Sequence, residues 1–280
     1  ENLLEPAGPI DPEVCFISVR EPDGKPISLF AAYSLHYVGG VGPHHVSADY
    51  FGEFCTHLTH LLQADHQEPP FVPMLANGTS GDINNINFRE PRGRRAPYEQ
   101  IQYVAHDVAA KVQAALEQVE YESDPKLAAV YREPELGWRK LTEKEIAWAR
   151  ETDAAGAKNE RDLSYIYSQR LLRLNEYPET TTIPLHALRL GSVCIGTMPC
   201  EVFCEIGMEF KDRAPFANAF MVELAHGYFG YLPTPRHHDL GGYETWPGTN
   251  KLERNASTIL LDQLVEMATS LAPQPAAAPQ

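Results

Sequence analysis

The chain has 280 residues and a formal net charge of −15, and its 43% of hydrophobic and 22% of charged residues are ordinary proportions for a globular protein with a substantial core. A surface this acidic repels phosphate backbones, so nucleic acid is not an expected partner, and it argues against binding anionic membranes through a basic patch. The five cysteines are odd in number and include no CxxC pair, which argues against a disulfide framework and a cysteine zinc site.

Strand and helix patterns alternate through the first part of the chain. Residues 1–6 have neither the basic head nor the apolar run of a signal peptide, so we expect them to belong to the interior of a longer protein. No apolar run approaches the roughly 20 residues that cross a bilayer. The turn Glu21-Pro22-Asp23-Gly24 joins two strand patterns, and apolar residues at helical spacing follow Ser47 and Asp49. The predicted elements are strands at 14–20, 26–35 and 71–76 and helices at 47–62 and 101–119.

The second part of the chain begins with a charge-rich stretch, 121–180. Thr142 and Glu145 have the spacing of a capping box there, which indicates helices on the outside of the domain. Strands at 181–190 and 193–198 form a hairpin, and Pro199 opens a helix, because proline costs little at a first turn. A strand at 219–224, a loop rich in glycine, proline and histidine at 225–250 and a helix at 252–271 complete the pattern. The alternation predicts an α/β domain at 1–271, a layered mixed sheet flanked by helices, with a disordered low-complexity tail at 272–280.

Polar residues follow several of the predicted strands, which is where sites collect in α/β sheets. His36 ends an apolar strand and precedes the turn Gly39-Gly40, so its imidazole could serve as a metal ligand or make ordinary hydrogen bonds at a strand end. The loop 77–85, which reads Asn-Gly-Thr-Ser-Gly-Asp-Ile-Asn-Asn, could let the backbone approach a ligand, although surface turns prefer the same residues.

Two further candidate segments lie later in the chain. Glu201 is expected on the first turn of the helix after Pro199, where it could bind a metal or complement the helix dipole. The loop 227–234 and its continuation at 241–244 carry tyrosines and glycines that could line a pocket or pack on the core. No GxSxG, phosphate-loop or HExxH motif is present in the sequence.

Taken in chain order, these four segments resemble the neutral ceramidase family, and the likeness runs from about residue 11 to about residue 267. In that family a histidine between a strand and a Gly/Pro-rich turn, a glutamate in a Pro-x-Glu segment and a tyrosine in a Tyr-x-x-Tyr step are zinc ligands. The residues that match are His36, Glu201 and Tyr231. A second tyrosine twelve positions further on, followed by glutamate, is proposed to steady the oxyanion, and Tyr243 before Glu244 matches it. The spacing of the two tyrosines is the most specific part of the resemblance.

The chain departs from the family pattern in two places. The family's remaining zinc histidine lies in a His-x-His segment well upstream, and no histidine precedes His36 here, so the resemblance implies that this ligand comes from absent sequence, such as a companion N-terminal fragment. The family loop Gly-Asp-Val-Ser-Pro-Asn reads Gly-Asp-Ile-Asn-Asn here, so Asn84 replaces a serine beside the zinc. An asparagine is no nucleophile, but its amide can orient water or a carbonyl. Asn84, its loop neighbour Asp82 and Tyr243 are the catalytic candidates.

The resemblance implies that the chain is the C-terminal portion of a ceramidase-like catalytic domain. Its expected activity is zinc-dependent hydrolysis of an N-acyl bond, in a small-molecule or lipid substrate, by metal-activated water. A location outside the cytoplasm is implied in the same way. Two alternatives stay open: a non-catalytic binding protein on the same scaffold, which the replaced serine and the missing histidine favour, and a zinc hydrolase of esters or lactones.

Overall fold

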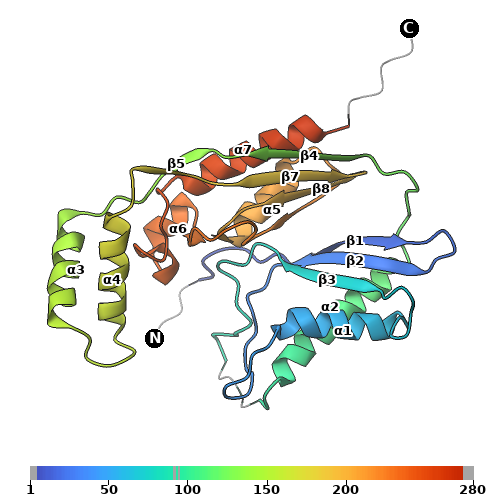
Figure 1. The fold of residues 1–280 in the computed structure, drawn as a ribbon, viewed down its shortest axis with the longest axis horizontal. Coiled ribbons are helices and arrows are strands. Elements are labelled where there is room, and N and C mark those ends of the chain that lie inside the picture. The colour runs from blue at the N-terminus through green and yellow to red at the C-terminus, as the bar shows by residue number, and fades with distance from the viewer. Residues whose placement is uncertain (1–4, 91–92, 94, 274–280) are drawn as a thin grey trace, which may run out of the picture.

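The computed structural model describes residues 5–90, 93 and 95–273, and its elements form four layers in the order helices, sheet, sheet, helices (Figure 1). The first sheet has the strand order β1-β2-β3, with β1–β2 antiparallel and β2–β3 parallel. Helices α1 and α2 pack against each other and cover its outer face. The bounds are Val14–Arg20 for β1, Pro26–Tyr33 for β2, Val72–Asn77 for β3, Asp49–Leu61 for α1 and Glu99–Leu116 for α2.

The second sheet has the order β10-β8-β7-β4, in which only β10 and β8 run parallel. Helices α5 and α7 pack on it, mainly against β10 and β7. The bounds are Leu127–Arg132 for β4, Leu185–Leu190 for β7, Val193–Thr197 for β8, Asn218–Val222 for β10, Cys204–Arg213 for α5 and Ala256–Leu271 for α7.

Three hydrophobic clusters correspond to the three contacts between these layers. One lies between the first sheet and its helices, with Tyr50, Phe54 and Leu58 of α1 at its centre. A second lies between the second sheet and α5 and α7. The smallest joins the two sheets and includes Ile195 and Phe220. Strand β8 is buried at four of its five positions, and it reads as a nearly continuous apolar run for that reason.

Several short strands and helices lie at one end of the two sheets, and a pair of helices projects from that end. The helices α3 and α4 form a projecting hairpin (Figure 1), and α3 begins with the expected capping box between Thr142 and Glu145. The bounds are Glu135–Gly137 for β5, Glu143–Ala155 for α3, Leu163–Asn175 for α4, Thr180–Thr182 for β6, Glu201–Val202 for β9, Tyr231–Leu232 for β11, Pro235–Leu240 for α6 and Tyr243–Thr245 for the 3-10 helix η1.

The predicted class, a mixed α/β fold with flanking helices, is confirmed. The hairpin at 181–198 and both helices of the first half are present within a few residues of their predicted ends. The strand β4 was not expected, because its six residues stand in a charge-rich stretch and alternate exposed with half-buried positions at the sheet edge. The extent of a catalytic domain at 1–271 stays a prediction, and most of the predicted disordered tail, 274–280, lies outside the described residues.

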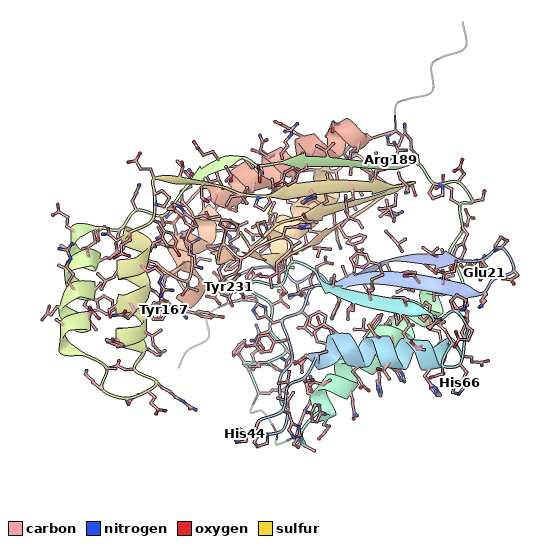
Figure 2. The ribbon with its side chains drawn as sticks, in the orientation of Figure 1. Glu21, His44, His66, Tyr167, Arg189 and Tyr231 are labelled. Carbon is pink, nitrogen blue, oxygen red and sulfur yellow. The ribbon has the colours of Figure 1, made fainter. Side chains whose placement is uncertain are left out.

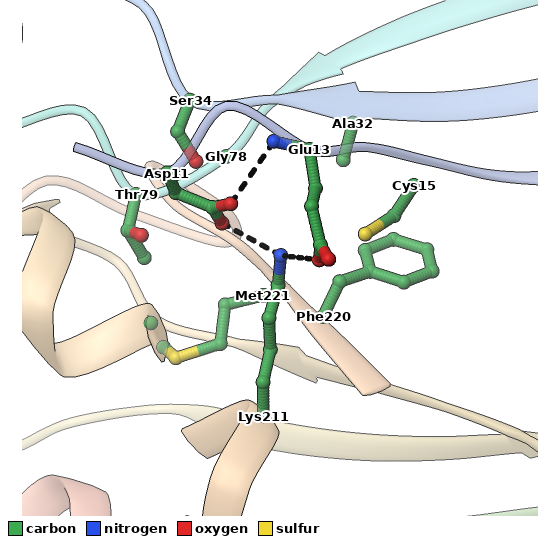
Figure 3. A pocket seen from close by; sticks show the side chains of 11 residues that line it. Asp11, Glu13, Cys15, Ala32, Ser34, Gly78, Thr79, Lys211, Phe220 and Met221 are labelled. Carbon is green, nitrogen blue, oxygen red and sulfur yellow. Dashed lines mark hydrogen bonds and ion pairs between the residues drawn. The ribbon is translucent and has the colours of Figure 1, made fainter. Parts of the chain in front are cut away.

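A buried ion cluster fastens the start of the chain to α5 (Figure 3). The ammonium of Lys211 contacts the Asp11 carboxylate at 2.6 Å and that of Glu13 at 2.8 Å. Asp11 is buried, whereas Glu13 is mostly exposed. Burial works against the charge of Lys211, but the two carboxylates outweigh it and raise its pKa. The lysine therefore stays charged and ties residues 11–13 to the helix.

Replacing Asp11 with asparagine should lower the free energy of unfolding by about 1.5 kcal/mol, because it removes a charged acceptor from a buried ammonium that keeps only Glu13. Urea unfolding followed by circular dichroism measures this. Glu13→Gln is the control, since exposed ion pairs contribute at most about 1 kcal/mol. Equal losses in both variants would contradict the assignment of Asp11 as the buried partner.

Candidate metal centre

His36 lies just past the end of β2, where α1 fixes the backbone on both sides of it. The phenol of Tyr50, fully buried on α1, donates to the carbonyl oxygen of Leu35 at 2.7 Å. The carboxylate of Asp49, at the start of α1, accepts from the amides of residues 38–39 at 2.8 and 2.7 Å. These hydrogen bonds fix the backbone on both sides of His36, which orients its side chain.

Glu201 and Tyr231 reach the same place on a pair of short parallel strands. In the pairing of β9 with β11, Glu201 is the partner of Tyr231. Paired residues project to the same face of a sheet, so both side chains point the same way. The prediction that Pro199 opens a helix is wrong, because residues 201–202 join this strand pair and α5 begins only at Cys204.

The predicted ligands and the predicted oxyanion residue are in mutual contact. His36 Nε2 lies 3.3 Å from Glu201 Oε2 and 3.2 Å from the phenol oxygen of Tyr231. The phenols of Tyr231 and Tyr243 are 3.2 Å apart. Figure 2 marks Tyr231 near the middle of the molecule, and Figure 1, in the same orientation, places α6 beside this region. His36, Glu201 and Tyr231 are largely buried while Tyr243 is about half exposed, so the cluster opens to solvent on the Tyr243 side.

The proton on His36 is placed by a backbone carbonyl. Its Nδ1 lies 2.5 Å from the carbonyl oxygen of Ser80, which only accepts, so Nδ1 carries a proton and Nε2 faces Glu201. Burial works against the charged imidazole, but Glu201 and the charge of Glu223 outweigh it and raise the pKa of His36. Burial also works against the Glu201 carboxylate, but hydrogen bonds from His36 and two tyrosines outweigh it and lower its pKa.

The two phenols of the cluster hold their protons firmly. Burial first, and then the bond to Glu201, raises the pKa of Tyr231 far above its usual range. Burial also raises the pKa of Tyr243, although the bond with Tyr231 opposes it. Tyr243 is therefore a hydrogen-bond donor at neutral pH, whereas Tyr231 would need a bound cation to become a phenolate ligand.

Three residues that contact the cluster or its supports, Tyr228, Ser80 and Glu223, were not predicted from the sequence as site residues. Tyr228 donates to Glu201 Oε1 at 2.8 Å. The hydroxyl of Ser80 donates to Glu223 Oε1 at 2.7 Å and lies 3.3 Å from His36 Nδ1. The Tyr-x-x-Tyr step could have indicated Tyr228, and a glutamate at the end of an apolar strand could have indicated Glu223.

Asp82 and Asn84 do not join the cluster. Asp82 Oδ1 accepts from the amide of Cys204 at 2.7 Å, so this carboxylate, from the loop after β3, bonds the first amide of α5. Burial raises its pKa although that bond opposes the shift. Asn84 is exposed, and its side chain has no hydrogen-bond partner among the residues that the structure describes. Among the described residues, no side-chain bond links Asp82 or Asn84 to His36, Glu201 or the two tyrosines. The catalytic roles of these two residues stay predictions.

Two of the three separations among the candidate donor atoms match those expected around a tetrahedral zinc ion. Donor atoms about 2.0–2.2 Å from zinc at tetrahedral angles lie about 3.3–3.6 Å from one another, and His36 Nε2 lies 3.3 and 3.2 Å from its two neighbours. In the described part of the chain, no group of three or more histidine, cysteine, aspartate and glutamate side chains could hold a metal ion. The cluster has only two side chains of these types, so the fit depends on the phenol of Tyr231.

Gly81 should be intolerant of any side chain, because the loop 77–85 approaches β9 backbone to backbone. Its amide donates to the carbonyl of Val202 at 2.8 Å, and a Cβ atom there would lie 2.6 Å from the carbonyl oxygen of Glu201. We expect Gly81→Ala to lower the free energy of unfolding by about 2 kcal/mol, measured by urea denaturation. Gly137→Ala is the control, since its Cβ would approach only the side chain of Glu253, with Oε1 the nearest atom at 3.2 Å, and no backbone atom. A Gly81→Ala protein as stable as this control would refute the close approach.

The fold is that of solved ceramidases. A neutral ceramidase from Pseudomonas aeruginosa matches with a TM-score of 0.65 at 16% identity, covering 97% of this chain and 49% of that one. A structure described as a ceramidase complexed with C2 matches with a TM-score of 0.69 at 14% identity, covering 97% of this chain and 50% of that one. This chain thus spans about half the length of each structure. No family model and no curated protein matches its sequence.

Proposed function

We propose that this chain is part of a zinc-dependent hydrolase that cleaves an N-acyl bond, as ceramidases do. The observation that carries the proposal is the convergence of His36, Glu201 and Tyr231, with the nitrogen of the first 3.3 and 3.2 Å from the oxygens of the other two. The shared fold with ceramidase structures supports a hydrolase of this type. Three protein donors and one open position are the usual arrangement of a catalytic zinc.

The roles of the residues follow from their contacts. When bound, zinc would supply a nucleophilic water at neutral pH and Lewis acidity toward the acyl carbonyl. Nδ1 of His36 is saturated by Ser80, so only Nε2 is free to bind. Tyr228 holds the second oxygen of Glu201 and leaves Oε2 directed at the cluster. Tyr243, half exposed and protonated, would donate to the carbonyl oxygen of the substrate as negative charge develops on it.

Two measurements on the 280-residue chain test the proposal. The first is zinc content after dialysis against zinc at neutral pH, for which we expect one ion per chain. The second is hydrolysis of fluorogenic N-acyl amides beside matched esters and lactones, with acyl chains from short to long. Zinc-dependent cleavage of amides supports the proposal. Cleavage of esters or lactones alone favours the ester or lactone hydrolase. A complete polypeptide, with the upstream segment, that folds and binds no zinc favours the binding protein.

Several parts of the proposal rest on the resemblance alone. They are a lipid or small-molecule acyl substrate, a location outside the cytoplasm and a companion segment that supplies a further histidine. No helix among the described residues is long and apolar enough to cross a membrane. A chain extended with the upstream segment should bind zinc more tightly if that segment supplies a ligand.

A further inference from the structure

One buried carboxylate outside the ligand set holds several strands together at the site. Glu223 follows the end of β10, is 3% exposed and has no basic side chain among its bonded partners in the described chain. Its Oε1 accepts from Asn77 Nδ2 and from the Ser80 hydroxyl, both at 2.7 Å. Its Oε2 accepts from the amides of Ser80 at 3.2 Å and Val202 at 2.6 Å.

The partners of Glu223 are the residues that hold the candidate ligands. Ser80 gives its carbonyl oxygen to His36 Nδ1, at 2.5 Å. Val202 directly follows Glu201 on β9, and its amide is fixed by Glu223. The carboxylate therefore connects β10, the loop after β3 and β9 at the point where the two sheets meet the cluster.

Burying a carboxylate away from basic side chains costs free energy, so its presence here calls for an explanation. Burial raises the pKa of Glu223 although its hydrogen bonds from Ser80 and Val202 oppose the shift. All four of its bonded partners are donors, which favours the carboxylate form, and a carboxylate without a basic partner is costly at the end of a strand that is otherwise apolar. Partners such as Ser80, which orient a metal-binding histidine through its second nitrogen, change metal affinity by about 10-fold to 100-fold when they are removed. Glu223 holds this partner in place and does not itself contact His36.

We propose that Glu223 is a positioning residue of the metal centre, which holds Ser80 and Val202 so that His36 and Glu201 keep the spacing of ligands. The inference rests on the proposed function, since it assigns a role toward the same ion. In this role Glu223 acts through Ser80 and Val202 and contacts neither substrate nor metal.

The informative variants are Glu223→Gln and Ser80→Ala. Glutamine keeps the shape of Glu223 but replaces one oxygen with a donor, which then meets the donors of Asn77 or Ser80. Alanine removes the Ser80 hydroxyl, which contacts both Glu223 and His36 Nδ1, and leaves the backbone amide and carbonyl of residue 80 in place. Asp11→Asn is the matched control, a buried carboxylate variant that weakens the fold at the Lys211 cluster instead.

Two readouts are compared across these proteins. The zinc dissociation constant is measured by competition with a chromophoric chelator. The tautomer of His36 is measured from its imidazole ¹⁵N chemical shifts in metal-free protein, at a pH where the ring is neutral. We expect Glu223→Gln to weaken zinc binding at least about tenfold and to reduce the population with a proton on Nδ1, whereas Asp11→Asn lowers the unfolding temperature and changes neither readout.

The outcomes separate this inference from the proposed function. A folded Glu223→Gln protein with native zinc affinity and native His36 shifts overturns the inference. If Glu223→Gln does not fold, Ser80→Ala decides by the same two readouts. If the native chain binds no zinc, the proposed function fails, and the His36 shifts alone decide whether Glu223 positions the ring.

Discussion

Replacing His36 with alanine is expected to abolish detectable zinc binding. Its Nε2 is the only nitrogen donor of the cluster, and it lies within 3.3 Å of the Glu201 carboxylate and the Tyr231 phenol. Without it, one carboxylate and one phenol remain, and two donors do not make a catalytic zinc site. Since outer partners alone account for about 10-fold to 100-fold, loss of a ligand should exceed this range. Zinc content after dialysis and calorimetric titration measure the effect.

The matched control for this variant is His45→Ala. His45 is an exposed histidine of the following loop, and its Nδ1 bonds the phenol of Tyr98 at 2.7 Å rather than any residue of the cluster. It should keep full zinc binding. The His36→Ala chain should also keep its fold, since Tyr50 and Asp49 still hold the backbone. Zinc retained at native stoichiometry in folded His36→Ala protein would end the metal assignment.

The elements that could be predicted from the sequence are those set by local pattern. The first two strands have a turn between them that sequence alone specifies, and α2 has a long apolar stripe. The strand β4 could not be recognised, because an edge strand of six residues has no local signal stronger than its charged surroundings. The pair β9–β11 could not be recognised either, because each strand has two residues and forms only by pairing with the other.

The candidate site divides in the same way. His36 and Tyr231 contact each other although they are 195 residues apart, and no periodicity links them; only a resemblance to a known family could bring them together. That resemblance is silent on Glu223, whose role depends on where its four donors lie in space. It also assigns the Gly-Asp loop to catalysis; that role stays a prediction, and the sequence gives no sign that Asp82 Oδ1 also accepts from the amide of Cys204 at the start of α5.

Replacing Tyr243 with phenylalanine should lower kcat by about 100-fold to 1,000-fold while KM and zinc affinity change little. The phenol is protonated at neutral pH, half exposed at the mouth of the cluster and 3.2 Å from the phenol of Tyr231, which places a donor next to the candidate ligands. A donor aimed at developing negative charge acts in the transition state more than in the ground state, so its loss appears in kcat. Steady-state kinetics on the best amide substrate measure both constants. Tyr37→Phe is the control, because this tyrosine adjoins His36 yet is 69% exposed. If Tyr243→Phe instead raised KM at constant kcat, the hydroxyl would bind substrate without stabilising the oxyanion, and the role proposed for it here would be wrong.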